Sequence, residues 1–166
     1  MTNPKLTQSH GMTKHISSYM NNRQLYWAGI LTALIAIIHI GIVIGGPEWY
    51  RFFGAGEGMA QQAEAGLALP VMITLMIALI LGIWALYAFS GAGEVAKLPL
   101  MEPILIIISS IFLLRGLLGI PLVMLIDDPY LNELREKMVF MFVSSLISMG
   151  FGILYAKGTR KLISYK

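Results

Sequence analysis

The chain has 166 residues, of which 57% are hydrophobic and only 13% are charged. Because soluble domains usually carry about 25% charged residues, this composition favours a protein embedded in a lipid bilayer, and the length suits a single domain. The absence of cysteine excludes disulfides, thiolate metal sites and a cysteine nucleophile. The net charge of +3 is too small for a nucleic-acid surface, so we predict no nucleic-acid partner.

The polar segment at the start of the chain, residues 1–25, is predicted to form a cytoplasmic arm. His10 and His15 lie in this arm and could begin a metal site. No third ligand lies near them, and protein metal sites need three or four. We therefore predict no metal ion, and no sequence motif indicates an organic cofactor.

Four apolar segments have the length of about 17–25 residues that a membrane-spanning helix needs. They are Tyr26–Gly45, Leu67–Phe89, Met101–Ile126 and Val139–Tyr155. We predict an all-α polytopic membrane protein, a four-transmembrane-helix bundle over residues 26–155, with a basic cytoplasmic tail over residues 156–166. Each span also has small or hydroxyl residues at helical spacing, which favour close helix packing in lipid. The main ones are Ala28, Thr32, Ala36, Ala78, Gly82, Ser109, Gly116, Gly119, Ser144, Ser148 and Gly152.

The connection after the first span is predicted to contain a short amphipathic helical segment. Pro47 suits a first helical turn, and the glycines Gly54, Gly56 and Gly58 should break the segment into two short helices. Two interpretations remain open: the segment lies on the membrane surface, or it folds over the bundle as a cap with its carboxylates inward. The residues assigned to one helical face are Trp49, Phe52, Phe53, Ala60 and Ala63.

The connection before the fourth span contains Asp127 and Asp128. Two adjacent carboxylates supply too few oxygens for a calcium site, so we interpret them as a helix cap before the fourth span.

The positive charges predict the orientation. They gather before the first span and after the last, whereas the first and third connections are net acidic, so the positive-inside rule places both termini in the cytoplasm. We predict a multi-pass protein of the bacterial inner membrane. The terminal cations are Lys5, Lys14, Arg23, Lys157, Arg160, Lys161 and Lys166.

Arg115 lies near the middle of the third span, where a charge costs roughly 2.5–3.5 kcal/mol on the milder scales. Such a residue usually faces a protein interior and has a partner. His39 lies about 9 Å below the outer end of the first span, whereas Glu102 is about 20 Å from Arg115 along its helix. We therefore expect Arg115 and His39 to share the outer half of the bundle. The proposed counter-charges are Glu48, Glu57 and Glu64 of the first connection.

Several stretches resemble a group of small bacterial four-span inner-membrane proteins to which no activity is assigned. They are His39–Glu57, Tyr87–Glu94, Lys97–Leu100 and Leu113–Gly116, and the resemblance covers roughly residues 26–126. It implies a bacterial origin and a helical bundle, and it implies nothing about chemistry.

The leading functional interpretation is that the protein binds or moves a small or lipid-like ligand, such as a quinone, a lipid headgroup or an anion. Arg115 would hold the anionic or carbonyl group, with His39, Glu57 and Glu64 beside it. The residues predicted to line the entrance are Trp49, Tyr50 and Phe53.

Two alternatives remain. The first is an accessory subunit that docks onto a larger membrane complex or forms a homodimer. The second is a small membrane enzyme that uses His39 with Glu57 or Glu64 for acid–base catalysis. No hydrolase, zinc-protease or nucleotide-binding motif is present, so an enzyme is not favoured.

Overall fold

The computed structural model describes residues 22–164, which form helices joined by short turns, with no strand in that range. The four long helices are α2 (Arg23–Gly45), α5 (Leu69–Ala92), α6 (Met101–Leu125) and α8 (Met138–Ser164). The three short helices are α3 (Pro47–Phe52), α4 (Glu57–Glu64) and α7 (Pro129–Glu136). All four long helices are long and apolar enough to cross a membrane. The predicted all-α four-helix bundle is confirmed.

The predicted spans match the long helices, with one large difference at the end of the fourth. The apolar pattern ends at Tyr155, but α8 continues to Ser164. Lysine and arginine end a hydropathy window without ending a helix, since both are good helix formers. Most of the predicted arm, residues 1–21 with His10 and His15, lies outside the described residues.

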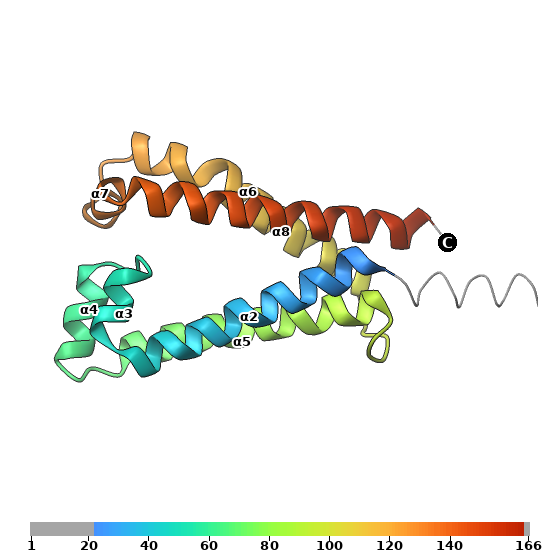
Figure 1. The fold of residues 1–166 in the computed structure, drawn as a ribbon, viewed down its shortest axis with the longest axis horizontal. Coiled ribbons are helices and arrows are strands. Elements are labelled where there is room, and N and C mark those ends of the chain that lie inside the picture. The colour runs from blue at the N-terminus through green and yellow to red at the C-terminus, as the bar shows by residue number, and fades with distance from the viewer. Residues whose placement is uncertain (1–21, 165–166) are drawn as a thin grey trace, which may run out of the picture.

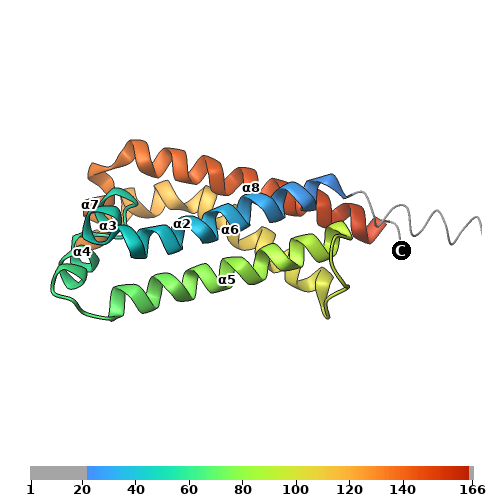
Figure 2. The ribbon, with the colours of Figure 1, turned by 60° about the horizontal axis from the view of Figure 1, so that its bottom comes forward.

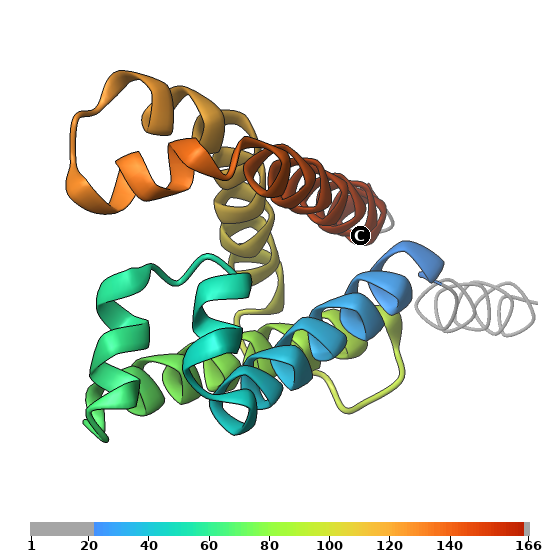
Figure 3. The same ribbon diagram turned by 60° about the vertical axis from the view of Figure 1, so that its left-hand side comes forward.

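The long helices form two pairs (Figures 1 and 2). In the first half of the molecule α2 packs against α5, and in the second half α6 packs against α8. The two halves converge at the end where α2 begins and α8 finishes, which we call the terminal end. The short helices α3, α4 and α7 lie at the opposite end, which we call the cap end. Figure 3 shows α6 crossing from α5 to the second half.

Small residues bring α6 and α8 into close contact, as their spacing predicts. A Cβ atom added to Gly116 would lie 2.9 Å from the backbone nitrogen of Met149, so only glycine fits there. Gly152 approaches α6 as closely, because its added Cβ would lie 2.9 Å from the nitrogen of Leu113. Ser109 Oγ donates a hydrogen bond to the Gly152 carbonyl at 3.0 Å. This is the packing expected of helices in lipid, where close approach replaces hydrophobic burial.

The outward faces of the spans remain apolar. Between 22% and 33% of each apolar window is buried inside the protein. Large side chains such as Ile44 and Leu125 are 82% and 83% exposed. A water-soluble protein rarely leaves so much contiguous apolar surface exposed, and these faces fit a multi-pass membrane protein.

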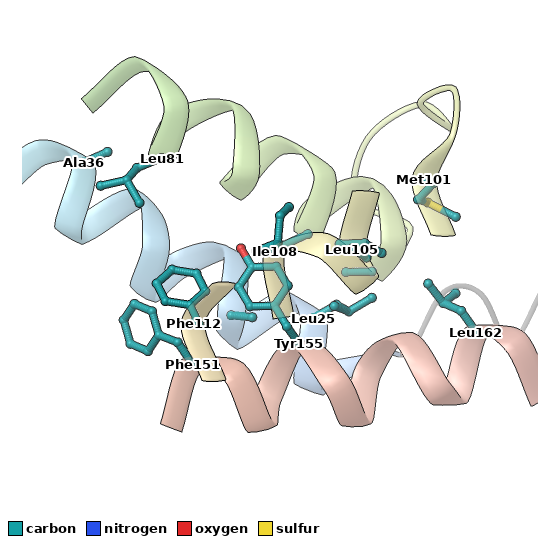
Figure 4. Close-up of a cluster of buried hydrophobic side chains, with 13 residues drawn as sticks. Leu25, Ala36, Leu81, Met101, Leu105, Ile108, Phe112, Phe151, Tyr155 and Leu162 are labelled. Carbon is teal, nitrogen blue, oxygen red and sulfur yellow. The ribbon is translucent and has the colours of Figure 1, made fainter. Parts of the chain in front are cut away.

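Buried side chains join the two halves at the terminal end (Figure 4). Tyr155 of α8 is fully buried, and its ring stacks on Phe112 of α6 at a centroid distance of 5.7 Å. The Tyr155 hydroxyl lies 3.1 Å from Thr32 Oγ1 of α2 and donates to the Trp84 carbonyl of α5 at 3.3 Å. Residues of all four long helices therefore meet around one tyrosine.

Candidate functional site

Arg51 of α3 collects the carboxylates of the first connection. Its guanidinium nitrogens lie 2.8 Å from Glu48, 2.7 Å from Glu57 and 2.8 Å from Glu64. The hydrogen bond from Arg51 lowers the pKa of Glu57, although partial desolvation opposes the shift. Hydrogen bonds to Glu57 and then Glu64 raise the pKa of Arg51.

This cluster corrects the expected pairing of Arg115. The three carboxylates proposed as its counter-charges bind Arg51 instead. The physical reason is proximity, because Arg51 lies in the same connection and pairing with it requires no ordering of a distant segment. Glu57 and Glu64 therefore do not point at Arg115 as free carboxylates.

The first connection forms the two short helices expected from its glycines, but its buried face differs from the predicted one. Gly54 and Gly56 have φ angles of +72° and +94°, which break the helical periodicity between α3 and α4. The predicted face assumed that the helical periodicity runs without a break through α3 and α4. Tyr50 is 1% exposed, packed with Ile42 and Ala60, whereas Trp49 is 45% exposed.

The Tyr50 hydroxyl is the second notable feature of this cap. It is buried and has no hydrogen-bond partner among the described residues. Phe53 packs against the edge of the same cluster. Of the three aromatic residues expected at the entrance, Tyr50 and Phe53 thus lie on the inner side of the cap.

A set of polar contacts, which we call the latch, joins the first connection to the second half at the cap end. The Glu57 N–H donates to Glu133 Oε2 at 2.7 Å, and the Tyr130 hydroxyl donates to the Gly54 carbonyl at 3.1 Å. Lys137 Nζ donates to the Arg51 carbonyl at 2.6 Å. These contacts favour the cap interpretation of the connection, because it docks onto α7 and the start of α8.

Helix α7 positions the second-half side of the latch. Asp128 caps it by accepting hydrogen bonds from the N–H groups of Tyr130 and Leu131. Arg135 anchors it to the end of α6 by donating to the Val123 carbonyl at 2.9 Å. The predicted helix cap is confirmed, although it caps this short helix rather than the fourth span.

The buried contacts around Tyr155 at the terminal end are called the joint below. Along α6, Arg115 lies between this joint and the cap end. It is three residues beyond Phe112, hence about 4.5 Å further toward the cap end on a neighbouring face of α6. Phe112 faces Tyr155 and Trp84, so Arg115 follows the side of α6 that faces the other helices. Burial and the nearby Glu133 raise the pKa of Tyr130, and the positive charge of Arg115 opposes this shift.

Arg115 is solvent-exposed, and among residues 22–164 it forms no ion pair or hydrogen bond. A guanidinium in an apolar span carries five donors that need partners. The same side chain that the sequence singled out is therefore unpaired within this part of the chain.

His39 lies on a comparable side of α2. It is seven residues after Thr32, which faces Tyr155, so it is about 10 Å closer to the cap end on nearly the same helix face. His39 Nδ1 lies 2.8 Å from the Ile35 carbonyl. Since a carbonyl only accepts, Nδ1 carries the proton, and Nε2 remains the ring's acceptor for another group.

The predicted site residues lie in separate parts of the molecule. Arg115 is on α6 of the second half, His39 is on α2 of the first half, and Tyr50 lies beneath the cap. Glu57 and Glu64 belong to the Arg51 cluster, and Trp49 is exposed. No protein-family model, curated protein or solved structure matches the chain. The resemblance to small bacterial membrane proteins therefore stays a prediction.

Proposed function

We propose that this membrane protein binds a small anionic or lipid-like ligand between its two halves, with Arg115 holding the anionic or carbonyl group. The observation that carries the proposal is the unpaired guanidinium of Arg115 in an otherwise apolar span. Holding a charge at that depth is costly unless a partner compensates it. The carboxylates expected to pair with Arg115 bind Arg51 instead, so a ligand can supply the counter-charge.

Two further groups support a polar ligand. His39 Nδ1 is committed to the Ile35 carbonyl, so Nε2 can accept a hydrogen bond from a ligand. The buried Tyr50 hydroxyl has no partner among the described residues, and a buried hydroxyl without a hydrogen bond is destabilising. A ligand with one anionic or carbonyl oxygen and an adjacent hydroxyl or carbonyl, such as a fatty acid or a quinone, fits these groups.

Opening of the latch is the proposed route by which such a ligand enters between the two halves. The latch consists of half-buried and exposed hydrogen bonds between side chains and backbone groups, which separate more easily than a buried core. We infer that release of the latch opens the cap end for ligand exchange, while the joint around Tyr155 stays closed.

The test uses oleate bearing a photoreactive diazirine and the matching oleyl alcohol, each added to the full chain in detergent micelles. We expect oleate to label residues near Arg115 and His39, and the alcohol to label them far less. Arg115→Gln should lower labelling roughly tenfold or more, and Arg115→Lys should lower it less, because lysine keeps the charge but loses the bidentate geometry.

The control is Arg23→Gln, which removes the same charge from the exposed start of α2 at the terminal end. Its labelling should equal that of the unmodified chain. Equal labelling in both Arg115 variants and the unmodified chain contradicts the proposal. Cross-linking of Arg115 to another protein in native membranes, with no oleate labelling, favours the accessory-subunit alternative instead.

The acid–base enzyme is the weaker alternative. Its carboxylates, Glu57 and Glu64, are held by Arg51, and the pKa of Glu57 is lowered rather than raised. A general base that works near neutral pH needs a pKa shifted upward toward that range. The paired Glu57 is therefore a poor proton acceptor for catalysis.

We also infer that the protein lies in a bacterial inner membrane with both termini in the cytoplasm. Four spans return the chain to its starting side, and the basic residues Arg23, Lys157, Arg160 and Lys161 lie at the terminal end. Fluorescent-protein and alkaline-phosphatase fusions at the end of the chain test this orientation. Fluorescence without phosphatase activity is expected, and the reverse result contradicts it.

A further inference from the structure

A groove of about 280 Å³ lies between α6 and α8 near the terminal end. Its lining mixes apolar and polar side chains. The apolar ones are Ile106, Ala156 and Ile163, and the polar ones are Ser109, Ser110, Thr159, Arg160 and Ser164. Arg115 does not line the groove, and the lining residue nearest to it along α6, Ser110, is five residues or about 7.5 Å away.

Thr159 carries an unsatisfied polar group in this lining. The residue is 3% exposed, and its hydroxyl is buried with no hydrogen-bond partner among the described residues. The serines of the lining differ, because Ser109 donates to the Gly152 carbonyl and Ser110 donates to the Ile106 carbonyl. An acceptor atom in the groove would supply the partner that Thr159 lacks.

The depth of the groove matches the boundary between hydrocarbon and headgroups. A span of about 20 residues counted from Met138 ends at Lys157. Ala156 then borders the hydrocarbon, whereas Thr159 and Arg160 lie at the level of the headgroups. Arg160 is exposed and positively charged, and a guanidinium binds phosphate oxygens through two parallel hydrogen bonds.

We propose that this groove binds the phosphate group of a membrane phospholipid. Arg160 pairs with the phosphate, the Thr159 hydroxyl donates to one of its oxygens, and an acyl chain packs against the apolar side chains Ile106, Ala156 and Ile163. The site takes its ligand from the surrounding bilayer and is independent of the ligand proposed for Arg115.

Native mass spectrometry of the full chain in detergent tests this site, with dioleoyl phosphatidylglycerol as the probe. Dioleoylglycerol has the same acyl chains without the phosphate, and inorganic phosphate has the phosphate without the chains. We expect retention of phosphatidylglycerol alone. Arg160→Gln should lower the apparent affinity roughly tenfold or more, and the near-isosteric Thr159→Val should lower it less.

Lys157→Gln is the matched control, because it removes one positive charge from the same helix end outside the groove. It should retain phosphatidylglycerol. Equal losses in Arg160→Gln and Lys157→Gln overturn the proposal, since they indicate non-specific attraction to positive charge. Retention of dioleoylglycerol as strong as that of phosphatidylglycerol, or binding of inorganic phosphate in place of the lipid, also overturns it. Thermal unfolding of each variant checks that the fold is kept.

Discussion

The two ends of the molecule join the same two halves by different chemistry. At the terminal end, Tyr155 is fully buried against Phe112 and is hydrogen-bonded to groups of α2 and α5. At the cap end, the halves meet through backbone carbonyls, a backbone N–H and the side chains of Tyr130, Glu133 and Lys137. A close-packed joint is lost only with the fold, whereas surface hydrogen bonds open at small cost.

This difference is consistent with the proposed function, which requires a stable bundle that opens at one end. The packed joint fixes the positions of α2 and α6 nearer the terminal end, and His39 and Arg115 lie further along these helices toward the cap end. The latch closes the other side through contacts that water or a headgroup can replace. The comparison therefore predicts large effects on stability at one end and effects on opening at the other.

The largest effect is expected from Tyr155→Ala. Removing a buried aromatic ring leaves a cavity and typically costs about 3–5 kcal/mol. It also leaves Thr32 Oγ1 and the Trp84 carbonyl without their bonds to the ring hydroxyl. Unfolding in mixed micelles with increasing sodium dodecyl sulfate measures the loss. Tyr155→Phe keeps the ring and should lose only about 1 kcal/mol. Equal losses in the two variants would mean that the hydroxyl, not the packing, holds the joint.

A second effect, somewhat smaller, is expected from Gly116→Val within the second half. The added side chain meets the backbone of α8, and overpacking of this kind typically costs about 1–3 kcal/mol. Gly150→Val is the matched control, because nothing lies within 4 Å of a Cβ added there. The same unfolding measurement should separate the two variants clearly. If they unfold alike, α6 and α8 do not approach each other as closely as described.

The latch variants should change opening rather than stability. Lys137→Met removes an exposed hydrogen bond and Glu133→Ala a half-buried one, and a hydrogen bond typically contributes about 0.5–1.5 kcal/mol. The chain has no cysteine, so spin labels can be placed on engineered cysteines at Ala65 and Glu136, both exposed. We expect the double variant to show longer distances between these labels. A second pair at Arg23 and Ser164, at the terminal end, should be unchanged. Lengthening of both pairs would mean that the halves do not hinge at the terminal end.

More of the helix packing near the joint than of the latch can be predicted from the sequence. The spans and the small residues of α6 and α8 follow from local composition and spacing, and the structure agrees with them. The Arg51–Glu48 pair can also be predicted from the sequence, because the two residues are one helical turn apart in the same segment. The contacts of Tyr130, Glu133 and Lys137 join residues 76 to 86 positions apart, and no local pattern reports such a distance.

The candidate site can likewise be predicted only where local sequence patterns determine it. Arg115 and His39 stand out because a polar residue in an apolar span is rare, and depth along the helices is simple geometry. Which carboxylate meets which arginine depends on how the connection folds after Gly54 and Gly56 change its direction. That change moves Tyr50 to the buried face and Glu57 to Arg51, two outcomes that a continuous helical face does not predict.

The smallest expected effect is a pH dependence confined to the cap end. Arg51 lowers the pKa of Glu57 in the folded protein, below the unfolded value of about 4.3. The carboxylate therefore contributes its stabilisation above about pH 4.3, and that stabilisation is lost as the pH falls through the folded pKa. Distances between the labels at Ala65 and Glu136 should be constant from pH 8 to pH 5 and lengthen only in more acidic buffer.

Glu57→Gln is the control, because it removes the titrating carboxylate and keeps the shape of the side chain. Part of the acid-induced lengthening should be missing in this variant, since Glu48 and Glu64 still bind Arg51. The labels at Arg23 and Ser164 should not respond to acid over the same range, because the joint there consists of uncharged groups such as Tyr155, Phe112 and Thr32. An equal acid response at both ends would show that protonation loosens the whole bundle, and that the latch is not a separate opening element.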